Sequence, residues 1–407
     1  MNEDRSGPQQ TVAIIVLIVR IQINMQPLRR LQNTAQQHSS NIFSSPRTYR
    51  VLYRRDFHTS RPQALQLHQP RKTHPLDREQ NLPRTRASSP PGHSTLRRTA
   101  HHIPCSTHSE IMSSTATVDS AYDPKTGTWQ YIVADPETLD AVIIDPVLDY
   151  DSSTQTVSTE TADRLLSLIN SKHYKIVRVL ETHAHADHLT AASYLQNALA
   201  RQQGFRPPVC IGKRISTVQQ AFGQRYGVPA QELEEAFDLL FEDGDVFYIG
   251  NLKVEVTHLP GHTPDHVGYM IADNVFCGDS VFIADLGTAR CDFPGGDAKA
   301  LYESTRKLLS LPDHYRIWTG HDYPTAERQT PVPFMSVGDQ KKQNRYLGDA
   351  VTATDFEKMR RERDAVLNEP KLLHPSLQIN IRGGKMPRAA SDGQRYMHLP
   401  LKFSSQM

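Results

Sequence analysis

The 407-residue sequence has few cysteines, few aromatic residues and no apolar run long enough to cross a membrane. Its 4 cysteines form no C-x-x-C pair, so they indicate neither a disulfide framework nor a zinc ribbon, and reduced intracellular thiols are expected. Residues 12–19 are all apolar, but a spanning helix needs about 20 residues. Glu3 and Asp4 do not fit the positive start of a secretory signal.

The net charge of +2 hides two regions of opposite sign. Residues 1–112 carry a formal charge of +10, and the rest of the chain carries −8. After residue 25 this arm is rich in Ser, Gln, Pro, Thr and Arg, so it cannot bury enough apolar surface to offset chain entropy and is predicted to be disordered. Aromatic residues are sparse among its arginines and no binding motif is present, so nucleic-acid binding is not expected.

The composition of the arm favours targeting. Residues 25–64 are rich in Arg and Ser with Asp56 as their sole acid, which is typical of a mitochondrial presequence. Residues 55–60 resemble a two-step mitochondrial processing signal, which predicts a mature chain starting near Leu65 in the matrix. Translation from Met112 would instead give a cytosolic form.

The densest group of candidate metal ligands is H-x-H-x-D-H at residues 183–188. It follows an apolar run at 176–180, which predicts a strand, and precedes a helix start at 189–192. Imidazole and carboxylate groups crowded at a strand end are costly unless something uses them. A divalent metal does so by pairing their lone pairs with positive charge. The alternative, a solvated polar turn, leaves the later motifs unexplained.

Three later motifs share one pattern, in which an apolar strand is followed by a glycine and then a candidate ligand. They are Gly261-His262, Gly278-Asp279 and Gly320-His321, after the runs 252–256, 274–277 and 315–318. Glycine permits a tight turn at each strand end. Ligands collected from several strand ends onto one edge make a metal site on a rigid scaffold.

Predicted strands and helices alternate from residue 113 to 388. Strand pairs and meanders occur in both halves, at 128–145 and 245–277, and helices are predicted at 161–169, 215–226, 298–309 and 356–367. This pattern predicts an α/β fold in which two mixed sheets pack together with helices outside, a four-layer αββα sandwich. Residues 370–388 contain several Pro and Gly and are predicted to be irregular, and residues 389–407 form a C-terminal tail.

Together the motifs resemble those of the metallo-β-lactamase superfamily. Within it, the similarity is to the longer bacterial and fungal persulfide dioxygenases, the group that contains the ethylmalonic encephalopathy protein. The matching runs are ETHAHADH (181–188), PGHTP (260–264), GDS (278–280), RCDF (290–293) and HDY (321–323). The resemblance implies the αββα sandwich and one Fe(II) per chain, held by His183, His262 and Asp279 as a two-histidine, one-carboxylate set.

The resemblance also implies the reaction and its remaining residues. Glutathione persulfide and O₂ would be converted to glutathione and sulfite, with His185, Asp187, His188 and His321 surrounding the iron as polar neighbours. Glutathione has two carboxylates, so cationic partners are expected. Arg290 is the first candidate, because arginine binds carboxylates bidentately, and Arg382 and Lys341 follow. Tyr323 is expected to hydrogen bond near the iron, whereas Cys291 has no role in this chemistry.

A dinuclear zinc hydrolase of the glyoxalase II type is the main alternative. His183, His185 and His262 would bind one zinc, Asp187, His188 and His321 the other, and Asp279 would bridge them. The absence of a helical domain after His321 and the RCDF run favour the dioxygenase. A binding module without catalysis is disfavoured because no ligand is lost. The insert at 213–242 would cover the pocket or form a subunit contact, which leaves a homodimer open, and no membrane contact is expected of the mature form.

Overall fold

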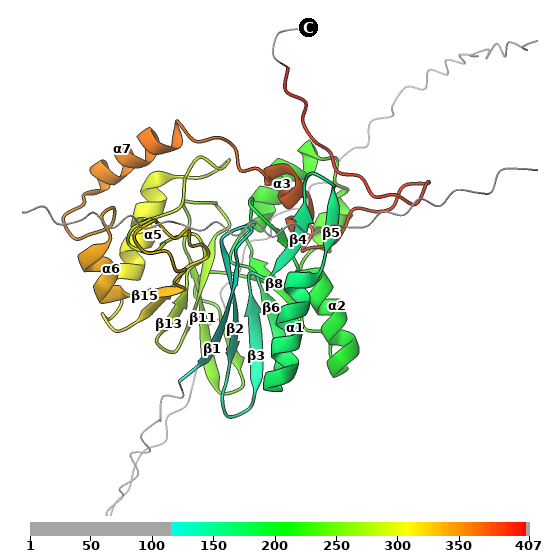
Figure 1. The fold of residues 1–407 in the computed structure, drawn as a ribbon, viewed down its shortest axis with the longest axis horizontal. Helices are drawn as coiled ribbons and strands as arrows, with labels where there is room; N and C mark the ends of the chain where they lie inside the picture. The colour runs from blue at the N-terminus through cyan, green and yellow to red at the C-terminus, as the bar shows by residue number, and fades with distance from the viewer. Residues whose placement is uncertain (1–114, 404–407) are drawn as a thin grey trace, which may run out of the picture. The chain divides into compact units, whose positions relative to one another are not determined.

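The computed structural model describes residues 115–403 (Figure 1). The predicted basic arm, its presequence and the alternative start at Met112 therefore lie outside the described residues. Among the helices that the structure describes, none is both long and apolar enough to cross a membrane.

Two six-stranded sheets form the centre of the fold, and both are mixed. The first has the strand order β1-β2-β3-β6-β8-β9, with antiparallel pairing from β1 to β3 and parallel pairing from β3 to β9. Its strands are β1 (Thr117–Asp123), β2 (Thr128–Ala134), β3 (Asp140–Ile144), β6 (Lys175–Leu180), β8 (Val209–Gly212) and β9 (Leu239–Phe241). The second sheet is antiparallel except between β13 and β14. Its strands, in spatial order, are β10 (Val246–Ile249), β11 (Leu252–His258), β12 (Val267–Ile271), β13 (Asn274–Phe276), β14 (Arg316–Trp318) and β15 (Phe334–Ser336).

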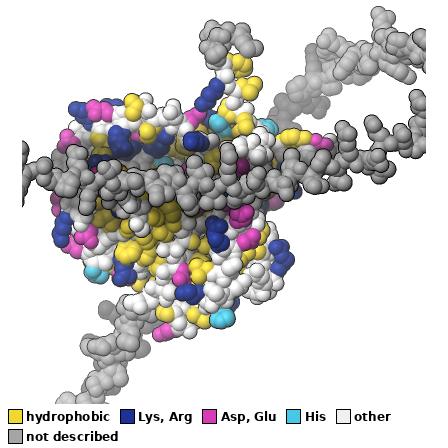
Figure 2. All heavy atoms as spheres, in the orientation of Figure 1, with side chains coloured by type: hydrophobic (Ala, Val, Ile, Leu, Met, Phe, Trp, Pro, Cys, Tyr) yellow, Lys and Arg dark blue, Asp and Glu magenta, His cyan; other side chains and the backbone are white. Residues whose placement is uncertain are grey.

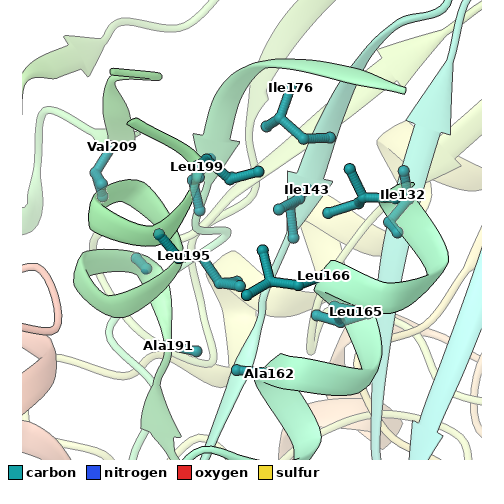
Figure 3. Packing of buried hydrophobic residues seen from close by; sticks show 14 of the residues in the cluster. Ile132, Ile143, Ala162, Leu165, Leu166, Ile176, Ala191, Leu195, Leu199 and Val209 are labelled. Atoms are coloured by element: carbon teal, nitrogen blue, oxygen red, sulfur yellow. The ribbon is translucent and has the colours of Figure 1, made fainter. Parts of the chain in front are cut away.

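Alternation along the strands builds the layers, since successive side chains point to opposite faces of a sheet. Ile132 and Ile143 pack outward against helices, as Figure 3 shows, whereas Val133 and Val142 pack inward against the second sheet. The helices outside the first sheet are α1 (Glu160–Lys172) and α2 (Ala192–Gln203).

The outer face of the second sheet is covered in the same way, with Val275 and Ile317 packed against helical leucines. Its helices are α5 (Ala298–Leu309), α6 (Val337–Gln343) and α7 (Ala353–Asp364). The four-layer αββα sandwich is therefore confirmed.

Two further groups of elements lie at one end of the sandwich. β4 (Val147–Asp151), β5 (Thr156–Ser158) and β7 (Leu189–Thr190) form a small third sheet. The insert folds as α3 (Ile215–Arg225) and α4 (Ala230–Glu234), and its buried Phe222 packs in one cluster with Leu377 of α8 (Leu373–Asn380).

The helix α8 corrects the prediction of an irregular segment at 370–388. Pro375 is the third residue of this helix, where a missing N–H removes no intrahelical bond, so the proline does not stop it. Seven of its eight residues are buried, which shows that packing rather than local propensity maintains it. The tail that follows joins it, because the His398 N–H donates to Gln378 Oε1 over 2.8 Å.

Candidate metal centre

The predicted ligands meet at one edge of the two sheets. The metal loop, residues 181–188, follows β6 directly, and His262, Asp279 and His321 follow β11, β13 and β14 within a few residues. All of these side chains except that of Asp187, which is partly exposed, are buried. Gly278 permits this convergence: its φ is +49°, and a Cβ there would lie 2.5 Å from Thr182 Oγ1.

Three side chains are arranged as a single ligand set. One ligand atom each from His183, His262 and Asp279 lies within 4.8 Å of the other two. Asp279 Oδ2 is 3.9 Å from His183 Nε2 and 3.6 Å from His262 Nε2. His183 Nε2 and Asp279 Oδ1 are buried without a hydrogen-bond partner in the described part of the chain. Leaving such atoms unpaired is costly, so these residues fit a bound metal ion.

A second set shares the same carboxylate. His321 Nε2 lies 3.2 Å from Asp187 Oδ2 and 3.5 Å from Asp279 Oδ2. His321 Nδ1 is 3.3 Å from the Gly127 carbonyl oxygen, to which it can only donate. Against the effect of burial, Asp279 and Asp187 raise the pKa of His321 to about 9. In the absence of metal, His321 therefore holds protons on both ring nitrogens at neutral pH.

The ligand histidines are oriented through their other nitrogen. His262 Nδ1 donates to the Arg290 carbonyl oxygen over 2.7 Å, which leaves the Nε2 lone pair for a metal. His183 Nδ1 lies 3.0 Å from Thr182 Oγ1, which donates to Asp145 Oδ2, so His183 Nδ1 is the donor. Burial and the neighbouring histidines lower the pKa of His183 well below its ordinary value, so it is a neutral ligand. Such partners fix the tautomer and direction of a metal-binding imidazole.

His185 has two carboxylate neighbours that were not predicted from the sequence. Its Nε2 lies 3.1 Å from Asp145 Oδ1 and 3.3 Å from Glu181 Oε2. Although burial opposes it, Asp145 and Glu181 raise the pKa of His185 well above its ordinary value. The opposite nitrogen, Nδ1, has no hydrogen-bond partner within residues 115–403, and His185 belongs both to this acidic group and to the group of His185, Asp187 and His188.

His266 positions the carboxylate ligand. The Asp279 N–H donates to His266 Nε2 over 3.0 Å, and the His266 ring stacks on that of His183 with centroids 4.6 Å apart. Burial lowers the pKa of His266 well below its ordinary value, which keeps Nε2 available as an acceptor. Its place in the run GHTPDH is the one sequence signal for this role, and it does not distinguish His266 from an ordinary core histidine.

A cavity of about 1110 Å³ opens from the metal centre. His262, Asp279 and His321 line its metal end, where Tyr323 stacks on His321 with ring centroids 5.7 Å apart. Tyr323 is 50% exposed and lines the same cavity. Phe282 and Leu286 add apolar surface beside the metal end.

Comparison with known proteins agrees with this geometry. The Metallo-beta-lactamase superfamily model matches residues 124–321. A protein described as Glyoxylase B2 from Dictyostelium discoideum is 39% identical over 298 residues, covering 72% of this chain and 100% of the relative. The chain belongs to the metallo-β-lactamase superfamily.

Other relatives are described by different functions. The chain is 41% identical over 288 residues to a Beta-lactamase hydrolase-like protein of Xylella fastidiosa, covering 70% of this chain but spanning 65% of that relative's length. It is 33% identical over 205 residues to human mitochondrial Persulfide dioxygenase ETHE1, covering 50% of this chain and 66% of the relative. The solved structure of ETHE1 from Myxococcus xanthus matches with a TM-score of 0.52 and 28% identity, covering 66% of this chain and all of that one.

In this superfamily member, the predicted substrate residues occupy different environments. Arg290 lines the cavity and pairs with Asp292. Arg382 and Lys341 were also predicted to bind the substrate, but neither is among the residues that line the cavity. Arg382 is 7% exposed and bonds Glu232 over 2.9 Å, and Lys341 pairs with Asp313 over 2.7 Å. Their charge was visible in the sequence, but their partners depend on tertiary contacts.

The insert packs against the segments that carry the metal loop and Phe293. Phe222 of α3 packs on Phe293, which follows Arg290, with ring centroids 5.5 Å apart. Ala184 and Ala186 of the metal loop belong to the same buried cluster. The insert thus contacts both segments that hold ligands in place.

Cys291 is buried beside the same segment. Burial raises the pKa of its thiol to about 12, so it is not a thiolate at neutral pH. This agrees with the expectation that it is not a nucleophile.

Proposed function

We propose that this chain is a persulfide dioxygenase that converts glutathione persulfide, O₂ and water to glutathione and sulfite. The outer sulfur loses four electrons, O₂ accepts them, and two protons are released. The observation that carries the proposal is the convergence of His183, His262 and Asp279 at the end of a large cavity. The similarity to persulfide dioxygenases supports it.

We assign one Fe(II) to these three residues. Two imidazoles and one carboxylate are the ligand set of non-heme iron oxygenases, and they leave positions open for reactants. Iron(II) would supply the electron transfer to O₂ that redox-inactive zinc does not. The protein contributes a fixed ligand geometry through the Arg290 carbonyl and His266.

The residues around this set have distinct tasks in the proposal. His321 Nε2 lies 3.5 Å from Oδ2 of the ligand carboxylate and faces groups that bind there. Tyr323 packs over His321 and lines the cavity, where its hydroxyl would hydrogen bond a reactant. Phe282 and Leu286 limit the access of water to this end of the cavity. The tripeptide would occupy the remaining volume, with its persulfide toward the metal.

A dinuclear zinc thioesterase is the second candidate. The shared carboxylate favours it, since Asp279 lies between the His183–His262 pair and the Asp187–His321 pair as a bridging ligand would. The similarity to a protein described as Glyoxylase B2 points the same way.

The deciding experiment measures metal content and reaction together. The chain is purified without oxygen, iron and zinc are quantified, and O₂ consumption with glutathione persulfide is compared with thiol release from lactoylglutathione. We expect about one iron per chain and sulfite formed in proportion to O₂ consumed. Two zincs per chain with thioester cleavage and no O₂ consumption would show that the hydrolase is correct.

We propose separately that the protein is located in the mitochondrial matrix. This proposal rests on the Arg-rich segment at residues 25–64, and sequencing the N-terminus of the native protein tests it. A mature start upstream of Met25 would contradict a presequence.

A further inference from the structure

One arginine on the cavity wall is buried and incompletely hydrogen bonded. Arg360 of α7 is 3% exposed and lines the cavity. Its Nη2 donates to Asp364 one turn later, but its Nε is buried and has no hydrogen-bond partner among residues 115–403. Nε is shielded even from the open cavity, but Nη1 is not shielded and has no hydrogen-bond partner among the described residues, so Nη1 is the donor that a ligand in the cavity can reach.

Arg290, the arginine selected from the sequence, differs in this respect. Its Nε and Nη2 both donate to Asp292, and its Nη1 donates to the Asn368 carbonyl over 2.8 Å. Each of its three guanidinium nitrogens thus has a partner within the chain. Arg360 has one partner and one buried nitrogen without any.

Other cations lie on the same wall. The cavity-lining residues contributed by residues 360–372, here called the cationic wall, include Arg363 and Lys371 and no acid. Lys371 has no ion-pair partner in the described part of the chain. Figure 1 places α7 along the upper left of the fold, and Figure 2 shows charged side chains of both signs on the outer surface there. The wall therefore favours an anionic ligand.

The cationic wall is linked to the metal centre through the backbone. The Asp364 carboxylate that pairs with Arg360 also accepts a hydrogen bond from the Cys291 N–H over 2.8 Å. The preceding carbonyl, that of Arg290, holds His262. Arg360 is thus held at a fixed position relative to the metal ligands, as a substrate-orienting group must be.

We propose that Arg360, with Arg363 and Lys371 beside it, is a carboxylate subsite that holds a peptide carboxylate of the substrate while its sulfur faces the metal. The guanidinium offers charge-assisted hydrogen bonds to the planar carboxylate, and Leu367 and Leu372 contact the apolar part of the ligand. Glutathione as the peptide rests on the proposed function, but the carboxylate preference does not.

The test uses S-methylglutathione, which has both carboxylates but no free thiol. Its binding to the full-length chain purified without oxygen is measured by calorimetry, beside its dimethyl ester. Arg360→Lys keeps the charge next to Asp364 but loses the planar fork, and should raise the Kd of the acid about tenfold. The double variant Arg360→Met/Asp364→Asn removes both charges together and should raise it about 10- to 100-fold. Arg361→Met, on the exposed face of the same helix, is the control and should bind like wild type.

The ester separates recognition from a structural role. We expect the ester to bind weakly to every variant, with no further loss on changing Arg360, whereas a merely structural role would weaken acid and ester alike. Should the double variant fail to fold, Arg360→Lys alone decides. Wild-type affinity in Arg360→Lys, or equal affinity of wild type for acid and ester, would overturn the subsite. If the wild type consumed no O₂ with glutathione persulfide, the proposed dioxygenase activity would be wrong, but the proposed carboxylate subsite would not be affected.

Discussion

The metal end of the cavity and its cationic wall are built in contrasting ways. At the metal end, His183 and His262 are held through their second nitrogen by Thr182 and by a backbone carbonyl, and they follow strands of the central sheets. The cationic wall comes from α7 and the segment leading to α8, and several of its charges are exposed. In the proposed function, rigid strand ends hold the metal ligands, and a helical segment outside the sheets determines which substrate binds in the cavity. Substitutions of ligands at the metal end should abolish metal binding. Substitutions in the cationic wall should change the affinity for the substrate and leave the metal bound.

The largest effect is expected for Asp279→Ala. This carboxylate belongs to both ligand groups, so its loss should remove the metal and lower turnover by more than about 1000-fold. Metal analysis and O₂ consumption measure the two effects, with circular dichroism as the check on folding. A folded variant that retained a full complement of metal would remove Asp279 from the ligand set.

Phe222→Ala tests the insert that packs against Phe293 and in one buried cluster with the metal loop. Truncating this buried ring should destabilise the fold by about 3–5 kcal/mol. Denaturant unfolding gives the free energy, and Phe205→Ala, at a 44% exposed ring, is the matched control. If both variants unfolded at the same denaturant concentration, packing of the Phe222 ring would not stabilise the fold.

His266→Leu should act on metal affinity without removing a ligand. It leaves the Asp279 N–H without its acceptor, and iron affinity should fall about 10- to 100-fold. Competition with a chelator gives this affinity. His266→Gln offers a side-chain oxygen in a similar place and should recover part of it. The same loss in both variants would indicate that ring stacking on His183, rather than the hydrogen bond, is what matters.

The smallest effect is expected for Arg290→Ala. The side chain is already paired with Asp292, so apparent KM should rise by no more than about tenfold, while bound iron stays unchanged because the carbonyl that holds His262 remains. Steady-state O₂ consumption and metal analysis check both statements. Loss of iron would show that the Arg290 side chain supports the metal site, and an unchanged KM would show that it does not bind the substrate.

The contrast between the two regions also explains what the sequence could predict. The metal ligands were visible because each lies just after an apolar strand, and His262, Asp279 and His321 also directly follow a glycine, a pattern contained within a few residues. The layers followed from the alternation of strands and helices. Partners distant in sequence were invisible: Asp145 beside His185 and Glu232 beside Arg382. For the same reason α8 was missed, since the Pro and Gly residues of 370–388 suggested a loop and only the packing of α8 shows a helix.

His262 is oriented by the backbone carbonyl of Arg290 and not by its side chain. The metal chemistry can therefore be conserved in evolution while the substrate specificity changes. Every amino acid has a carbonyl, so position 290 can change its side chain while the group that orients the ligand persists. Neighbouring positions on the cavity surface could therefore diversify among descendants without passing through an intermediate that cannot hold metal. A saturation library at residue 290 is thus a practical starting point for redirecting this scaffold to new substrates.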